Sequence, residues 1–244
     1  ASASAIYGSR AANGVIVITT KKGAKGGLKV VFNSQAGIST IAKKIDVLSA
    51  DEFRSLVNQY GNSAQKAKLG KANTTDNNLS VSGSLFNKLP ARVSVGNTTT
   101  PGILQNTKFE RTTTSLSLNP TFLDNHLKID LNGNLSFGKN QFQDEGNVIG
   151  SAIGFDPTQS VYQTGSRYDG YFEWLEANGD VNLLAAKNPV ARVNQNNRRS
   201  TSTRKWGNAR IDYKMHFLEE LKAVAELGID KFDREGFEET STSS

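Results

Sequence analysis

Residues that could catalyse a reaction or bind a metal are few and scattered in this sequence of 244 residues. His126 and His216 are far apart, and neither has a second His or a Cys at the spacing of metal ligands. Glu219 and Glu220 are adjacent, so on a strand they would face opposite ways and could not pair as general acid and base. The sequence has no cysteine, no phosphate-binding glycine loop and no Ser-His-Asp set. It therefore predicts a protein that is not an enzyme, with neither metal nor cofactor.

Recognition by side-chain surfaces is the chemistry that the sequence does favour. Aromatic side chains gather in one polar stretch, where flat rings can stack on sugars or anchor a protein interface. A second interpretation is that a long ordered loop uses the same rings as its own small core. Phe155 and Asp156 to Thr158 are expected to shape that loop. The candidates for contact with a substrate or a covering partner are Tyr162, Tyr168, Tyr171, Phe172 and Trp174.

The bulk composition excludes two classes of protein. With 36% hydrophobic residues and a mean hydropathy of -0.45, the chain is too polar for a helical membrane protein. No stretch approaches the roughly 18 apolar residues of a transmembrane helix. The net charge is +6, but the basic residues are scattered apart from one group among Ser, Thr and Asn, so nucleic acid is not expected as a partner. That group is Arg198, Arg199, Arg204 and Lys205.

Most of the chain after residue 27 alternates apolar and polar residues, which predicts β-strands with one apolar face. The clearest case is 127–137, where Leu127, Ile129 and Leu131 alternate with charged or amide residues. About seven strands are expected, several near the roughly 9–11 residues that cross a bilayer on a tilt. The alternating segments are 30–38, 78–85, 91–95, 115–119, 127–137, 208–215 and 221–230.

The polar positions of these strands carry charges that would cost a few kcal/mol each if they faced lipid. They are expected to face the lumen of a barrel, where they hydrate a channel or hold a plug by ion pairs. The lumen-facing candidates are Lys128, Asp130, Arg210, Asp212, Lys214, Glu226 and Asp230. The candidates for aromatic girdles at the membrane edges are Phe32, Phe122, Phe137, Trp206, Tyr213 and Phe217.

The connections alternate in expected length, which is typical of outer-membrane barrels with tight periplasmic turns and large outer loops. Short connections are expected at 86–90, 120–125 and 217–220, and long ones at about 40–76, 97–111 and 140–204. About seven strands cannot close a barrel wide enough to hold a plug. The chain is therefore expected to be part of a larger barrel.

The first 27 residues differ from the rest. Val15 to Thr20 is a β-branched run without alternation, as in a strand buried on both faces, and 21–27 is a Lys- and Gly-rich linker. The segment ASASAIYGSRAANGVIVITTKK resembles the end of the plug domain in TonB-dependent receptors, in the form found in the SusC/RagA family. The resemblance continues in order through 46–53, 78–83, 102–111, 156–159 and 188–191. The plug motif comprises Ala5, Ile6, Tyr7, Gly8, Ser9, Arg10, Asn13 and Gly14.

This resemblance implies an all-β fold: an antiparallel transmembrane β-barrel of about 22 strands, with 1–27 as the end of the plug and linker and 28–244 as the first barrel strands. It implies import of an oligosaccharide or peptide across the outer membrane of a Gram-negative, Bacteroidetes-like bacterium. The implied partners are a SusD-like lipoprotein, TonB acting through a preceding segment, and the lipid bilayer with its lipopolysaccharide. A siderophore or vitamin receptor of the same fold and a β-rich adhesin are the alternatives. A continuous apolar band about 25 Å tall would separate the barrel from a β-sandwich.

Overall fold

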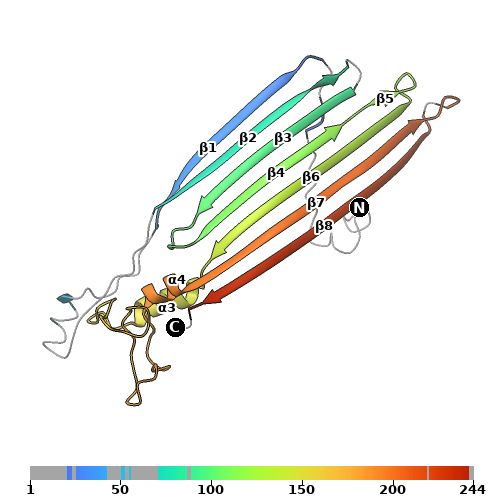
Figure 1. Cartoon of the computed structure of the whole chain (residues 1–244). Helices are drawn as coiled ribbons and strands as arrows, with labels where there is room; N and C mark the ends of the chain where they lie inside the picture. Colours follow the sequence, from blue (N-terminus) through green and yellow to red (C-terminus); the bar gives the residue numbers. More distant parts are fainter. Residues whose placement is uncertain are drawn as a thin grey trace.

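The chain folds into one antiparallel sheet with a helical loop at one end (Figure 1). The computed structural model describes residues 21–23, 26–42, 51–52, 55, 71–86, 89–218 and 220–241. The plug motif lies outside these residues. The sheet order is β1-β2-β3-β4-β6-β7-β8, with the short β5 paired to β6, which confirms the prediction of about seven long strands. The strands are β1 (Lys29–Ser39), β2 (Ala72–Leu85), β3 (Leu89–Pro101), β4 (Lys108–Leu118), β5 (Thr121–Phe122), β6 (Leu127–Phe142), β7 (Asn196–Lys214) and β8 (Lys222–Thr240).

The register of the sheet places the alternating residues on two unlike faces. Side chains directly opposite each other in an antiparallel pair lie on the same face. Leu131 on β6 is opposite Leu118 on β4 and Ala209 on β7, and Ala209 is in turn opposite Leu227 on β8. One face is therefore apolar across neighbouring strands. The other face carries the Ser, Asn and charged side chains that alternate with these residues.

Exposure on the two faces is the reverse of that in a water-soluble protein. On the apolar face Phe32, Leu227 and Ile229 are 64%, 78% and 73% exposed. On the polar face Ser80 and Ser117 are buried at 2% and 7% exposure. Soluble proteins bury large apolar side chains first. In the part of the chain that the structure describes, nothing covers the apolar face, so its partner must be another apolar medium or surface.

The apolar face has a definite height. On β6 it runs from Leu127 to Phe137. At about 3.3 Å per residue and a strand tilt of about 40°, this corresponds to a band roughly 25 Å tall. On β7 and β8 the same face becomes polar earlier, because Lys205 and Lys231 are in register with Leu135, and Thr203 and Asp233 with Phe137. A band of this height matches the apolar core of an outer membrane.

The strands reach further than the sequence indicates, and this corrects the expected loop bounds. Thr98 to Pro101 pair with Lys108 to Arg111, so the connection expected at about 97–111 shrinks to 102–107. β-Branched threonine favours the extended strand there. In the same way Lys139 to Phe142 pair with Arg198 to Thr201. The connections between strands at this end are 40–71, 102–107 and 143–195, and at the opposite end 86–88, 119–126 and 215–221.

The connection 143–195 is an ordered loop with two short helices, α3 (Glu145–Gly154) and α4 (Pro189–Gln195). Asp144 caps α3, and its carboxylate accepts a hydrogen bond from the backbone N–H of Asn147 at 3.2 Å. That bond favours the ionised carboxylate and lowers the pKa of Asp144. No helix in the described part of the chain is long and apolar enough to cross a membrane.

Asn188 connects α4 to the rest of this loop. Its side chain is fully buried. Its Oδ1 accepts hydrogen bonds from the backbone N–H groups of Val190 and Ala191 at 3.0 and 3.2 Å, which caps the helix. Its Nδ2 donates to the backbone carbonyls of Val161 and Phe172 at 2.8 and 3.2 Å. One side chain therefore joins the helix to two loop segments distant in sequence.

Replacing Asn188 with Ala should open the loop without unfolding the sheet. The change removes the cap, worth about 1 kcal/mol, and leaves the Phe172 carbonyl unpaired at about 1–3 kcal/mol, while the Val161 carbonyl keeps the Phe172 N–H as a donor at 3.1 Å. We expect hydrogen exchange of 143–195 to accelerate at least about thirtyfold, since about 1.4 kcal/mol is a factor of ten.

Asn178→Ala is the matched control, because the Asn178 side chain contacts only Asp180 in an exposed turn. Asn188→Asp keeps the cap acceptor and should give an intermediate effect. Equal protection in Asn188→Ala and Asn178→Ala would contradict the role assigned to Asn188.

Candidate functional site

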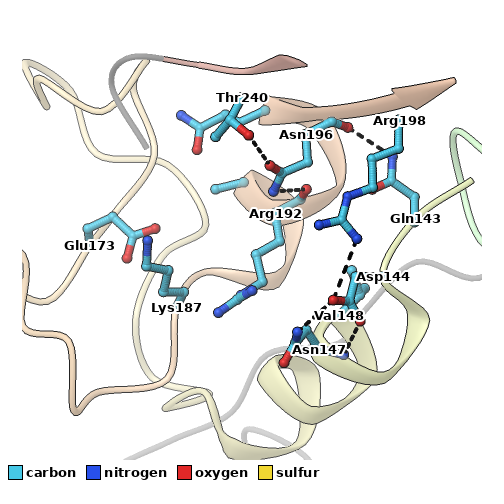
Figure 2. A pocket seen from close by; sticks show the side chains of 12 residues that line it. Gln143, Asp144, Asn147, Val148, Glu173, Lys187, Arg192, Asn196, Arg198 and Thr240 are labelled. Carbon is cyan, nitrogen blue, oxygen red and sulfur yellow. Dashed lines mark hydrogen bonds and ion pairs between the residues drawn. The ribbon is translucent and has the colours of Figure 1, made fainter. Parts of the chain in front are cut away.

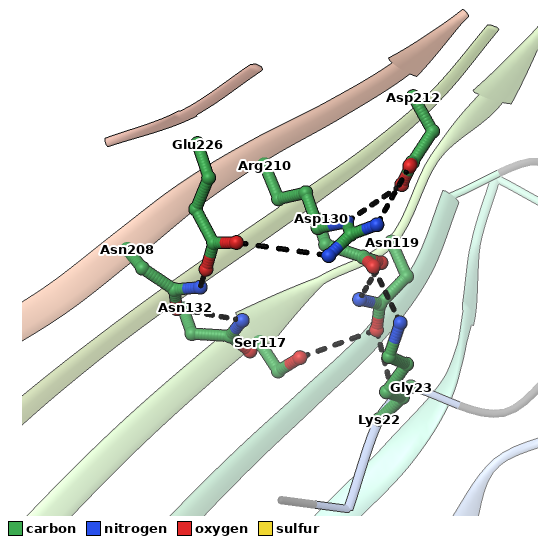
Figure 3. Close-up of polar contacts among 10 residues, drawn as sticks. All are labelled: Lys22, Gly23, Ser117, Asn119, Asp130, Asn132, Asn208, Arg210, Asp212 and Glu226. Atoms are coloured by element: carbon green, nitrogen blue, oxygen red, sulfur yellow. Dashed lines mark hydrogen bonds and ion pairs between the residues drawn. The ribbon is translucent and has the colours of Figure 1, made fainter. Parts of the chain in front are cut away.

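A network of charged and amide side chains lies on the polar face, towards the end with the short turns (Figure 3). Its members come from β6, β7, β8, the end of β4 and the segment that precedes β1. Asp130 lies directly opposite Arg210, and Arg210 directly opposite Glu226, so the register alone brings these three together. We call this set the polar cluster: Lys22, Ser117, Asn119, Asp130, Asn132, Asn208, Arg210, Asp212 and Glu226.

Arg210 bridges two strands of the polar cluster. Its Nε and one terminal nitrogen donate to the two carboxylate oxygens of Asp212 at 3.0 and 2.9 Å. Its other terminal nitrogen lies 3.6 Å from Glu226 on β8. Glu226 also accepts from Asn208 at 3.0 Å. A guanidinium that forms a bidentate pair is held more rigidly than a lysine would be.

The other half of the polar cluster attaches the segment before β1 to the sheet. Lys22 forms an ion pair with Asp130, which also accepts a hydrogen bond from Asn119 at 2.7 Å. The backbone N–H of Gly23 donates to Asn119 at 2.8 Å. A Cβ on Gly23 would lie 2.5 Å from the backbone nitrogen of Ala91, so glycine is required for this close approach.

The structure places the predicted polar-face residues together and adds others that the sequence did not reveal. Asp130, Arg210, Asp212 and Glu226 lie in the cluster, and Lys128 shares their face opposite Asp212. Lys22 and Asn119 were missed. The Lys22–Asp130 contact joins residues 108 positions apart, and alternation along a strand carries no signal for such a contact.

Trp206 was expected in an aromatic girdle, and this prediction is wrong. It lies opposite Asn134 and Asp230 on the polar face, because Lys205 and Gly207 take the apolar positions on either side. The guanidinium of Arg204 sits 5.1 Å from the ring centroid of Trp206 and forms an ion pair with Asp230. The indole therefore supports a charged pair. By register, Phe32, Phe122, Phe137 and Tyr213 lie on the apolar face.

The aromatic residues of the long loop divide into two groups. Phe155 is 3% exposed and packs edge-on against Phe172 at 6.1 Å, and Phe172 packs against Trp174 at 5.1 Å. Phe155 and Tyr168, at 9% exposure, are buried in the loop, and Phe172 and Trp174 are half-buried beside them. Tyr162 is 61% exposed. Its ring lies 5.3 Å from that of Tyr171, with the planes tilted by 34°, and this pair faces solvent.

The two histidines meet although they are distant in the sequence. The rings of His126 and His216 stack with centroids 4.0 Å apart and planes within 9°. Each also makes a hydrogen bond, to the carbonyl of Lys214 and the hydroxyl of Tyr213 respectively. The stack joins the turns 119–126 and 215–221. Among the described residues, no group of three or more His, Cys, Asp or Glu is placed to hold a metal ion.

Asn119→Ala should release the segment around Lys22 from the sheet. The change removes the acceptor for the Gly23 N–H and the donor to Asp130, each worth about 1 kcal/mol net. We expect trypsin to cleave after Lys21 or Lys22 at least about fivefold faster. Asn134→Ala, on the same face but outside the cluster, should leave the rate unchanged. Equal rates for both variants and the native protein would show that Asn119 does not hold the segment.

Comparisons with known proteins identify the family. No family model matches the chain. The TonB-dependent receptor SusC of Bacteroides thetaiotaomicron is 40% identical over 253 aligned residues, which cover 93% of this chain and 25% of SusC. The TonB-dependent receptor P3 of Formosa agariphila is 31% identical over 191 residues, 69% of this chain and 18% of P3. This chain therefore spans about a quarter or less of the length of these relatives.

Solved structures show the same fold. The RagAB peptide importer in its open-open state matches with a TM-score of 0.73 at 18% identity, over 97% of this chain and 31% of that one. Its closed-closed state matches with a TM-score of 0.66, over 98% of this chain and 32% of that one. Together with the identity to SusC along nearly all of its length, this shows that the chain belongs to the SusC/RagA family of TonB-dependent receptors, with its open sheet forming part of their β-barrel.

Proposed function

We propose that this chain is part of a transporter that imports an oligosaccharide or a peptide across the outer membrane, powered through TonB and assisted by a SusD-like lipoprotein. The observation that carries this proposal is the pair of unlike faces on one sheet. An exposed apolar face about 25 Å tall suits lipid, and a polar face suits a hydrated lumen. A soluble adhesin would cover its apolar face with a second sheet, and the described residues form a single sheet.

In this arrangement the polar cluster lines the lumen. Lys128, Asp130, Arg210, Asp212 and Glu226 then face water and the plug, and the leucines between them face lipid. Most of the charges are already paired, so they cost little in a partly hydrated channel. Because its charges are paired, a wall of this kind allows a polar cargo to pass and has no unpaired charge that would bind it tightly.

Residues 1–27 are proposed to be the end of the plug domain and its linker, with the plug motif at Ala5, Ile6, Tyr7, Gly8, Ser9, Arg10, Asn13 and Gly14. Support comes from the segment that follows the motif. Lys22 and Gly23 are attached to Asp130 and Asn119 at the short-turn end of the polar face. A chain fixed there would lead into the lumen from the periplasmic side. The attachment would hold one end of the plug while force applied through TonB moves the rest.

The long loop would then stand on the outer side, where cargo and lipoprotein meet the transporter. Of the five aromatic residues proposed for this contact, the exposed Tyr162 and its neighbour Tyr171 are the best placed. A tilted pair of rings offers a flat apolar platform to a sugar ring or a peptide side chain. Tyr168, Phe172 and Trp174 would act indirectly, by keeping this platform in shape.

The orientation of the sheet predicts opposite effects of one substitution on its two faces. Leu131→Arg places a charge near the middle of the apolar face and should cost about 2–4 kcal/mol of stability in a bilayer. Asn134→Arg, on the polar face, should be tolerated. The measurement is the urea midpoint for folding of the full-length protein in lipid vesicles. A larger loss from Asn134→Arg than from Leu131→Arg would reverse the assignment of the faces.

Growth of the host tests the import function. A strain lacking the full-length protein should lose growth on one glycan polymer or on peptides and keep growth on the corresponding small subunits. Complementation with Tyr162→Ala should weaken cargo binding by about threefold to tenfold, as expected for one lost stacking contact, and Tyr162→Phe should restore it. Normal growth of the deletion strain on every polymer and peptide, with the native protein present at the cell surface, would refute import.

A further inference from the structure

A small polar pocket lies where the long loop meets the ends of β6, β7 and β8 (Figure 2). Helices α3 and α4 form two of its walls, and the loop around Glu173 and Lys187 forms a third. Its volume is about 260 Å³. A pocket of this size accommodates one sugar ring or one amino-acid residue of a larger ligand.

Arg192 is the cationic side chain that this pocket leaves least satisfied. It extends from α4 into the space between Lys187 on one side and Val148 of α3 and the capping residue Asp144 on the other (Figure 2). Its Nε is buried and has no hydrogen-bond partner. Among the described residues no carboxylate forms an ion pair with Arg192 or Lys187. The terminal nitrogens of Arg192 also make no hydrogen bond to the described residues, and an unpaired donor on a charged group costs more than most unmade hydrogen bonds, so an acceptor at these nitrogens is favoured.

The walls around Arg192 are braced independently of its guanidinium. Asn196 donates to the backbone carbonyl of Arg192 at 3.1 Å and accepts from Thr240 on β8 at 3.0 Å. The buried Gln143 donates to the carbonyls of Val193 and Asn196 at 3.2 and 3.0 Å. The pocket is thus held open by amide side chains, and the guanidinium is available to a ligand.

The remaining charges indicate a monoanionic ligand. Arg198 is already compensated, by Glu238 at 2.5 Å and Asp144 at 3.7 Å. Arg192 and Lys187 are left to attract an anion, with Glu173 opposing them. The three cations Lys187, Arg192 and Arg198 are balanced in number by Glu173, Asp144 and Glu238, so a single negative charge meets less repulsion here than the double charge of a phosphate. The planar fork of an arginine also matches the two oxygens of a carboxylate.

We propose that this pocket binds a carboxylate group of the cargo, with Arg192 as its main contact and Lys187 as a second cation. The carboxylate would come from a uronic acid in a glycan or from a free carboxyl group of a peptide. Its assignment to the cargo rests on the proposed import function, but binding itself is measurable without transport.

Glu173 gives the site a dependence on pH. Burial is the main cause that raises its pKa, so it takes a proton more readily than an exposed glutamate. Asp144 instead stays ionised, because the Asn147 N–H and Arg198 lower its pKa. Acidification therefore removes the charge of Glu173, which repels the ligand; the other charged groups around the site are Lys187, Arg192, Arg198 and Glu238. Carboxylate binding should tighten as the pH falls from about 8 to about 5.

The test is calorimetric titration of the purified full-length protein with four probes: trigalacturonate, its methyl ester, a short peptide with a free C-terminal carboxylate, and the same peptide as an amide. At least one acid should bind tenfold or more tightly than its neutral partner. Arg192→Met should abolish that preference, since a hydrogen bond to a charged group is worth about a tenfold or greater change in affinity. Glu173→Gln should remove the pH dependence.

Arg199→Met is the matched control, because Arg199 lies on the opposite face of β7 from Arg198 and pairs with Glu239. It should leave the preference intact. An unchanged proteolysis pattern of 143–195 in Arg192→Met would show that the loop still folds.

Preference for trigalacturonate alone, or for the peptide acid alone, identifies the source of the carboxylate. Equal binding of acid and neutral forms to the native protein overturns this proposal and leaves the import function untouched. Carboxylate preference in a protein whose deletion has no growth defect overturns import alone.

Discussion

The hydrogen-bond register of one antiparallel sheet is the constraint on which the rest of the molecule depends. Once Leu131 is paired with Leu118 and Ala209, the face of the flanking residues on all three strands is decided. A slip by one residue would turn Asp130 and Arg210 towards the apolar side and the leucines towards water. The side-chain alternation and the backbone ladder must therefore agree along each strand, as they do on β6 from Leu127 to Phe137.

On the polar face of the sheet, charged side chains lie close together with little loss of stability. Arg210 is satisfied by two carboxylates, and Asp130 is satisfied by Lys22 and Asn119. Each charge is thus balanced by a neighbour, which lowers the penalty of partial burial. The same contacts attach the segment before β1 to the wall. The same contacts therefore balance the charges of the polar face and position the segment that leads to β1.

The long loop solves a different problem, because it projects from the sheet and cannot share its packing. It builds a small core from Phe155, Phe172 and Trp174, and it uses the buried amide of Asn188 to join its segments. Hydrogen bonds from Gln143 and Asn106 to the carbonyl of Val193 connect it to the strand ends below. In the pocket beside this loop, the buried Nε of Arg192 has no hydrogen-bond partner.

The sequence by itself determined the number of long strands, the two faces of the sheet and the family, because a period of two and a plug-like segment are local patterns. It separated Leu127, Ile129 and Leu131 from Lys128 and Asp130 correctly. It made the long loops too wide, as at 97–111 where the connection is 102–107, because polar Thr and Asn residues can extend a strand beyond the membrane, where alternate residues no longer have to be apolar. It placed Trp206 on the wrong face, because a single aromatic residue does not show to which face of the strand its side chain points.

Only the tertiary structure decided which distant residues meet. The contact of Lys22 with Asp130, the stack of His126 on His216 and the pocket around Arg192 each join segments that lie far apart in the sequence. Their positions follow from the register of several strands together and from the path of a long loop. Periodicity describes one strand at a time. Contacts between strands and loops depend on the path of the connections that bring the chain back to the sheet. The packing and hydrogen bonding of the whole sheet together fix that path.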